Sequence, residues 1–269
     1  KKSLIIEKEE ELGGYCRSVN QDGFIWDFSG HFFHFRNKKI KKIMLSKIGC
    51  KVLDIKKKST IFYNNKFIEF PFQKNIHQLN KKEFIECLVG LFSKHKKQKS
   101  KNFKDFVIDN YGEAICKKFL IPYNEKLYAT NLNKLEWNAM GRFFPSIHKD
   151  EIIKGFKKKN FTSYNDYFTY PKNGAVSYVK SLQRQIKNAE YKLNTSVKKI
   201  EIKKKIIHLD NGEIIPYENL ISSIPFPNLL QKCNISYNKN IFSANKVCVF
   251  NLGFDKKSFH KDHWIYFPS

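Results

Sequence analysis

Ser3-Leu-Ile-Ile-Glu7-Lys-Glu-Glu-Glu-Leu-Gly13-Gly14-Tyr-Cys-Arg17-Ser18 is the stretch of sequence that decides the fold. Its short apolar run ends in an acid, and a charged segment then leads to a pair of glycines. This order predicts a buried β-strand that runs into a glycine turn.

The rest of the chain alternates between strand-like and helix-like patterns. Turn residues predict two hairpins, one across Asn64-Asn65 and one across Asp210-Asn211-Gly212. Pro122 marks the expected end of the second helix. We expect helices at 81–94, 103–119 and 174–186, and further strands at 51–55, 60–63, 66–70, 197–202, 205–209, 213–216, 219–222 and 246–252. This order predicts an α/β fold with a second part inserted into the first.

Composition sets the class of protein. Of the 269 residues 41% are apolar, which is enough for a sizeable core. No apolar run approaches the roughly 18 residues of a membrane span, and no signal peptide opens the sequence. The six cysteines are irregularly spaced, with no Cys-x-x-Cys pair. This spacing indicates reduced thiols in a cytoplasmic protein and predicts no metal site.

The net charge of +25 raises the question of a polyanionic partner. The basic residues are scattered, however, and only four of the 50 are Arg, which leaves 46 as Lys. Proteins that read nucleic acids specifically rely on Arg for bidentate contacts. We therefore expect no nucleic-acid partner, whereas the charge would suit contact with an anionic membrane surface.

The opening stretch resembles the second FAD motif of the superfamily that contains the amine oxidases, protoporphyrinogen oxidases and UDP-galactopyranose mutases. The resemblance implies a glutathione-reductase-like, Rossmann-type FAD-binding domain. It implies that Glu7 binds the ribose hydroxyls of FAD. It also implies that the cofactor phosphates are bound by Gly13, Gly14, Arg17 and Ser18. Taken alone, Glu7 would more often be a solvated glutamate in an acidic run.

Asp27-Phe-Ser-Gly-His31 is similar to the Gly-Gly-His segment of the mutases, which passes beside the flavin ring. The resemblance implies that Gly30 and His31 shape and polarise the flavin pocket. The alternative is that His31 is a structural histidine among phenylalanines.

Two further segments resemble the nucleotide-binding parts of the eukaryotic-type mutases. Phe70-Pro-Phe-Gln-Lys-Asn-Ile76 implies that Phe70 and Phe72 flank a uracil and that Gln73 reads its edge. Pro122-Tyr-Asn-Glu-Lys-Leu-Tyr128 implies that Asn124 and Tyr128 touch the nucleotide ribose. An aromatic stretch of this kind is also common in a plain hydrophobic core.

The resemblance also implies residues that bind the diphosphate and the sugar of the substrate. Arg142 stands eighteen residues after Asn124, at the position of the mutase arginine that clamps the diphosphate. Asp262-His-Trp-Ile-Tyr-Phe-Pro268 resembles a mutase segment that would place Trp264 near the galactose and Tyr266 at the diphosphate. The catalytic residues implied by the resemblance are His31 and Arg142.

Two interleaved domains are expected: residues 1–50 with 171–235 for FAD, and residues 51–170 with 236–269 as a mixed α+β substrate domain. The implied activity is an isomerase that interconverts UDP-galactopyranose and UDP-galactofuranose through a reduced-flavin–sugar adduct, with NAD(P)H as a possible reductant. The alternative is an FAD-dependent oxidoreductase of the amine oxidase or protoporphyrinogen oxidase type.

The phosphate-binding glycine loop that the resemblance implies would precede Lys1, and the C-terminal FAD segment would follow Ser269. We therefore expect a chain truncated at both ends that binds FAD poorly by itself. A homo-oligomer is possible.

Overall fold

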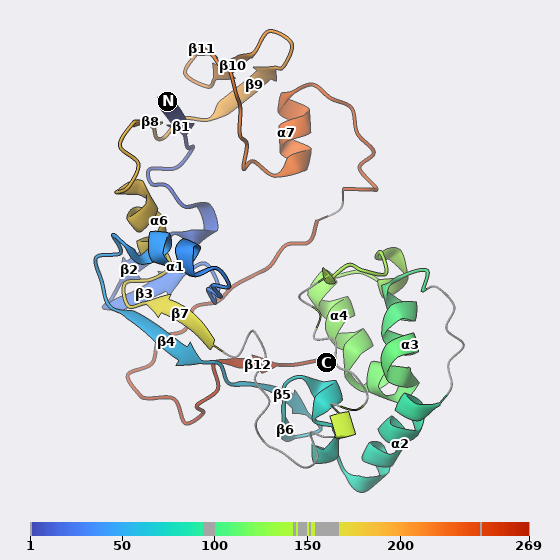
Figure 1. Ribbon diagram of the computed structural model, residues 1–269. Coiled ribbons are helices and arrows are strands. Elements are labelled where there is room, and N and C mark those ends of the chain that lie inside the picture. The colour runs from blue at the N-terminus through green and yellow to red at the C-terminus, as the bar shows by residue number, and fades with distance from the viewer. Residues whose placement is uncertain are drawn as a thin grey trace. The chain divides into compact units, whose positions relative to one another are not determined.

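The computed structural model describes residues 2–93, 100–141, 144, 150, 152–153, 167–242 and 244–268 (Figure 1). The chain divides into two compact units, Lys1–Ile55 with Phe168–Asp255 and Lys56–Tyr167 with Lys256–Ser269. The boundaries of these units differ from those of the expected domains at residues 51–55, 168–170 and 236–255, which all belong with the first unit. Within the described ranges, no helix combines the length and apolar character that crossing a membrane requires.

Short sheets form the first unit. The apolar run of the opening stretch is strand β1 (Ser3–Ile6), which pairs in parallel with β8 (Ala189–Lys192). Two antiparallel hairpin sheets and one further pair complete the set: β2 (Ser18–Gln21) with β3 (Phe24–Asp27), β9 (Val197–Glu201) with β10 (Ile206–Leu209) and β11 (Ile214–Pro216), and β4 (Val52–Lys56) with β7 (Tyr167–Pro171).

Three α-helices accompany these strands. Helix α1 (Lys38–Leu45) begins at Asn37, whose side chain accepts hydrogen bonds from two backbone amides of its first turn, and it packs against α6 (Val176–Gln183). Helix α7 (Phe226–Lys232) contacts β9. A short helix, Gly14–Cys16, begins at the second glycine of the pair.

The second unit joins a small sheet to a helical layer. Strand β5 (Ser59–Tyr63) lies between β6 (Lys66–Glu69) and β12 (Trp264–Tyr266), antiparallel to the first and parallel to the second. The expected hairpin turn is confirmed, because Asn64 and Asn65 both have positive φ. The longer helices among the described residues of this unit are α2 (Lys81–Phe92), α3 (Phe103–Ile115), a π-helix at Cys116–Leu120 and α4 (Ile121–Tyr128).

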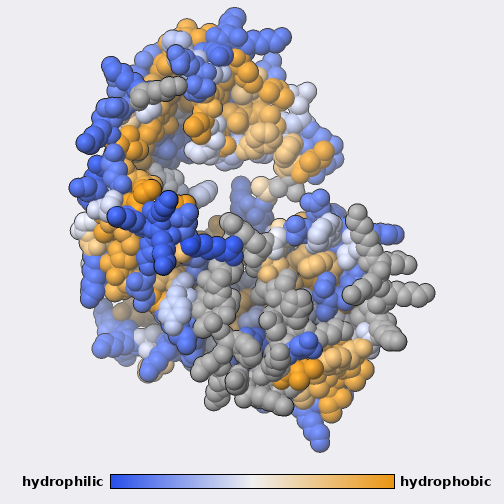
Figure 2. All heavy atoms as spheres, in the orientation of Figure 1, coloured by the Kyte–Doolittle hydropathy of each residue, from blue (hydrophilic) through white to orange (hydrophobic). Residues whose placement is uncertain are grey.

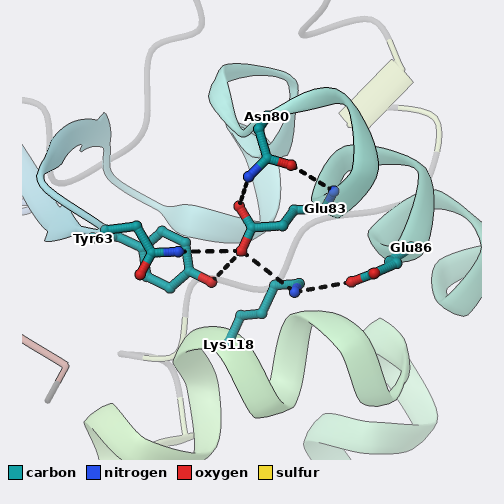
Figure 3. Close-up of polar contacts among 6 residues, drawn as sticks. Tyr63, Asn80, Glu83, Glu86 and Lys118 are labelled. Atoms are coloured by element: carbon teal, nitrogen blue, oxygen red, sulfur yellow. Dashed lines mark hydrogen bonds and ion pairs between the residues drawn. The ribbon is translucent and has the colours of Figure 1, made fainter.

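A polar cluster fastens this sheet to the helices (Figure 3). The Glu83 carboxylate of α2 accepts a hydrogen bond from the Tyr63 hydroxyl at 2.7 Å, and its oxygens lie 2.6 Å from Asn80 Nδ2 and 3.5 Å from Lys118 Nζ. Lys118, on the π-helix, also pairs with Glu86 at 3.0 Å. Because Tyr63, Glu83 and Lys118 come from β5, α2 and the π-helix, the cluster joins these three elements. The side chains of Glu83 and Lys118 are mostly shielded from solvent.

Three sequence-based expectations about elements were wrong. Pro122 begins α4 instead of ending a helix, since proline fits the first turn, where its missing N–H costs nothing. Among the described residues, 219–222 and 246–252 form no strand. Ile221 is 97% exposed and Phe250 82% exposed, so neither segment has the packed neighbour that a strand needs.

Candidate functional site

The glycine turn after β1 has the backbone form that the sequence requires. Gly13 has φ of 127° and Gly14 φ of 54°, values that favour glycine. A Cβ added at Gly14 would meet nothing within 4 Å, so this backbone is open to an incoming group. The Glu7 carboxylate accepts a hydrogen bond from the Glu9 amide at 3.1 Å, which holds it at the end of β1.

The guanidinium of Arg17 is held within the same turn. It donates to the Gly14 carbonyl at 3.1 Å and to the Glu9 carboxylate at 3.2 Å, and it lies 5.5 Å from the centre of the Phe28 ring. The nearby Arg17 charge lowers the pKa of Glu9. A phosphate at this turn would compete with Glu9 for the arginine.

Ser18 belongs to a network centred on Asp27. The Ser18 hydroxyl donates to the Asp27 carboxylate and accepts from the backbone amide of Val176 at 3.2 Å. The Tyr170 hydroxyl and the Ala175 amide also donate to Asp27. Burial and then the Asp27 carboxylate raise the pKa of Tyr170. The network therefore ties β2, β3, β7 and the start of α6 together.

His31 lies four residues after Asp27 in the sequence. Its Nε2 atom is buried and has no hydrogen-bond partner among the described residues. Its ring lies 6.3 Å from the ring of Phe33, measured between centroids. A buried ring nitrogen without a partner is costly unless a ligand or an ordered water satisfies it. Gly30, directly before it, is exposed.

In the second unit, the predicted substrate residues take part in a series of ring contacts. Phe70 stacks on Tyr266 with centroids 4.8 Å apart. Tyr123 meets Tyr266 edge-on at 5.2 Å and stacks on Phe119 at 5.0 Å. Phe119 in turn stacks on Phe72 at 5.1 Å, and Phe72 is completely buried. Phe72 therefore supports the other rings from within the core.

Amides and hydroxyls lie beside these rings. Asn124 is 1% exposed: its Nδ2 donates to the Leu120 carbonyl at 2.6 Å, and its Oδ1 has no partner among the described residues. Gln73 is buried beside Phe72. Burial raises the pKa of Tyr266 and raises that of Tyr123 to about 12.

The remaining predicted residues lie at the edges of this group. Trp264 is half-buried, with its ring 6.1 Å from that of Tyr266. Tyr128 is half-buried on α4, and burial raises its pKa. Arg142 lies outside the described residues. Within them, no group of His, Cys, Asp or Glu side chains could hold a metal ion.

Sequence reasoning missed three residues of these two sites: Asp27, Tyr170 and Tyr123. Asp27 stood at the start of the quoted His31 segment, and Tyr123 stood inside the Pro122–Tyr128 segment. Both residues therefore lay inside motifs that the sequence analysis had selected. Their roles depend on partners distant in the sequence, such as Ala175 and Tyr266, which a local pattern cannot predict.

Comparison with known proteins places this arrangement in a family. A family model described as flavin containing amine oxidoreductase matches residues 1–264. The chain belongs to this family. Its fold is therefore a mixed α/β fold with an FAD-binding, amine oxidase-like domain, as expected from the sequence.

Solved structures with the same fold include members of several activities. A reduced UDP-galactopyranose mutase superimposes with a TM-score of 0.77 at 20% identity, covering 86% of this chain and 57% of the mutase. A putative protoporphyrinogen oxidase from Exiguobacterium sp. 255-15 gives 0.60 at 18% identity, with 85% and 55% covered. A CLA-producing fatty acid isomerase from P. acnes gives 0.54 at 15%, with 85% and 54% covered. The chain thus spans little more than half the length of these proteins.

The residues of the first unit fit the flavin that the family implies. They offer an open backbone at Gly14, a carboxylate (Glu7) at the end of a parallel strand and a buried ring nitrogen (His31 Nε2) that has no partner among the described residues.

Proposed function

We propose that this chain belongs to a flavin-dependent UDP-galactopyranose mutase that interconverts UDP-galactopyranose and UDP-galactofuranose. The observation that carries the proposal is the pairing of stacked aromatic rings with a buried amide oxygen that has no partner within the described part of the second unit. Stacked rings suit a nucleobase, and an amide suits its edge or the ribose. An apolar substrate would leave Asn124 Oδ1 without a partner.

The first unit would hold FAD. In this proposal Glu7 binds the ribose, the Gly13–Gly14 backbone admits the phosphates and Arg17 exchanges Glu9 for a phosphate oxygen. His31 offers Nε2 to the flavin pocket, and Gly30 keeps the approach open. Bound and reduced, the flavin supplies the nucleophile for the anomeric carbon with no net redox change. NAD(P)H is the proposed reductant.

The second unit would hold the UDP-sugar. Phe70 offers its ring to the uracil, while Tyr266 supports that ring from one face and aims its hydroxyl at the diphosphate. Asn124 and Tyr128 bind the ribose, Gln73 reads the base, and Trp264 lies toward the sugar. Burial keeps the Tyr266 phenol protonated, so it can donate a hydrogen bond to a phosphate oxygen when the UDP leaves. Arg142 is proposed to neutralise the same diphosphate.

The test uses the full-length protein that contains this chain, purified with FAD bound, reduced with dithionite and incubated with UDP-galactofuranose, and product is followed by chromatography. We expect UDP-galactopyranose only under reducing conditions, and a loss of at least tenfold in Arg142→Ala and Tyr266→Phe, since each removes a charge-assisted contact to the diphosphate. Lys198→Gln, an exposed change in β9, is the control. Absence of conversion, together with a flavin spectrum that UDP does not perturb, would assign the protein to the oxidase class.

A further inference from the structure

Helix α1 carries a dense positive charge. The segment from Arg36 to Lys47 has six basic residues, and no acidic residue occurs between Arg36 and Asp54. Lys41 pairs with Asp54 at 3.1 Å, whereas Lys39 and Lys42 are exposed. Figure 2 shows hydrophilic atoms gathered over the part of the molecule where Figure 1 draws α1.

The same helix also exposes aliphatic side chains. Ile40 and Ile43 are each 52% exposed, and no residue of α1 is fully buried. They are three positions apart, as are Lys39 and Lys42, so the two pairs form neighbouring strips on the helix. Met44, four positions after Ile40, lines a pocket with Leu182 of α6. The isoleucine strip therefore borders the side of α1 that packs on the protein, whereas the lysine strip lies away from that side.

Contacts with α6 fix this orientation. The Gln185 side chain donates to the Ile43 carbonyl at 2.9 Å, and Arg184 donates to the Lys47 carbonyl at 2.8 Å. The Lys47 amide donates to the Ser181 hydroxyl at 3.3 Å. The charged groups contributed by α6 and its end are Lys180 and Arg184, and Lys180 lies 3.9 Å from Glu11. The surface around α1 therefore stays basic.

We propose that α1 is an interfacial anchor that docks this protein on anionic lipid headgroups, with Ile40 and Ile43 inserted at the headgroup level. A basic helix with an aliphatic strip has the composition of a membrane-surface helix. A nucleic-acid backbone would satisfy the lysines but would offer nothing to the two isoleucines. The anchor goes beyond the proposed mutase activity and does not depend on it.

The test is co-sedimentation of the 269-residue chain with vesicles of phosphatidylcholine containing 30% phosphatidylserine, at 50 mM and 500 mM salt. At low salt we expect binding that is lost at 500 mM salt and absent with pure phosphatidylcholine. Lys39→Gln/Lys42→Gln should weaken binding about 30-fold, since each lysine near an anionic surface contributes about one fivefold factor. Ile40→Asn/Ile43→Asn should also weaken it severalfold.

The matched control is Lys198→Gln/Lys203→Gln, which removes the same charge from exposed positions at β9 and the turn after it. It should bind like the unaltered chain, and circular dichroism should show that every variant is folded. Three results would overturn the proposal: no sedimentation with anionic vesicles, an equal loss in the control pair, or isoleucine variants that bind normally. Displacement from vesicles by duplex DNA in those isoleucine variants would indicate a nucleic-acid surface instead.

Discussion

The backbone amide of Ala175 donates a hydrogen bond to the carboxylate of Asp27 at 3.1 Å, across 148 residues of sequence. The same carboxylate accepts from the hydroxyls of Ser18 and Tyr170. One side chain thus fixes the first turn of α6 against the β2–β3 hairpin, immediately before the segment that carries His31.

Replacing Asp27 by Asn should therefore destabilise the first unit. The amide keeps one acceptor oxygen but turns an NH₂ group toward groups that donate to the carboxylate. We expect the free energy of unfolding to fall by about 2 kcal/mol, the usual cost of breaking hydrogen bonds to a half-buried charge. Urea unfolding measures it. Asp22→Asn, at the exposed turn of the same hairpin, should change it by less than about 0.5 kcal/mol, and equal effects would contradict this role for Asp27.

Gly174, one residue before Ala175, makes a sharper test of the same packing. Its φ is +83°, and an added Cβ would lie 2.9 Å from Ile25 Cγ2 and also against Ser18. Gly174→Ala should cost about 3 kcal/mol, because backbone strain and overpacking add.

Gly212 is the matched control, since its φ is +87° but an added Cβ would meet nothing within 4 Å. Gly212→Ala should cost only the backbone strain, about 1 kcal/mol. If thermal or urea unfolding gave the two variants the same loss, the close approach of Ser18 to Gly174 would not limit the packing.

The stability of the second unit should fall at alkaline pH. Burial raises the pKa of the Cys87 thiol from 9.0 to about 11, with Lys118 opposing the shift. The folded state therefore holds this proton more tightly than the unfolded state. Its stabilisation is complete below pH 9 and is lost as the pH rises through 11, with a slope of up to about 1.4 kcal/mol per pH unit.

Cys87→Ala should remove this contribution and lower the slope between pH 9 and 11, while the buried Cys116 thiol, whose pKa burial also raises, keeps part of the pH dependence. The measurement is the free energy of urea unfolding at half-unit steps of pH. Cys248→Ala, at an exposed position, should keep the slope of the unaltered chain. An unchanged slope in Cys87→Ala would mean that other buried groups, such as Tyr123, dominate.

The sequence predicted the strands and helices whose signals are local, but it did not predict β2, β3, β7, β8, β12, α1, α4 or α7. The Asn64-Asn65 turn needs only positive φ and flanking alternation, and both are present. The β2–β3 hairpin has a comparable turn pair, Asp22-Gly23, but it was not among the predicted hairpins. Residues 246–252 have strand composition but no strand, because pairing depends on a partner that composition does not encode.

The candidate sites divide in the same way. Gly13, Gly14 and Asn124 could be selected from short motifs, since a turn or a helix position fixes what they can do. The link between Asp27 and Ala175, or between Tyr123 and Tyr266, arises only when distant segments fold together. The structure also shows what no motif could: Arg17 already pairs with Glu9, and Phe72 is buried beneath other rings.

Asn124 allows a test in which stability and binding should change in opposite directions. Its buried Oδ1 has no partner among the described residues, and a polar atom in that state costs about 1–3 kcal/mol. Asn124→Leu removes this cost at similar volume, although it also removes the 2.6 Å bond from Nδ2 to the Leu120 carbonyl. We expect the free energy of unfolding to change by less than about 1 kcal/mol, because the two effects offset.

Binding of UDP should respond quite differently. If Oδ1 accepts a ribose hydroxyl, Asn124→Leu should weaken UDP at least tenfold in isothermal titration, the loss expected for one buried hydrogen bond. Asn133→Leu, near α4 but outside the ring contacts, is the control and should bind normally. A large loss of stability with unchanged UDP affinity would make Asn124 a structural residue of α4 and would leave the ring contacts without the polar group that a nucleotide site requires.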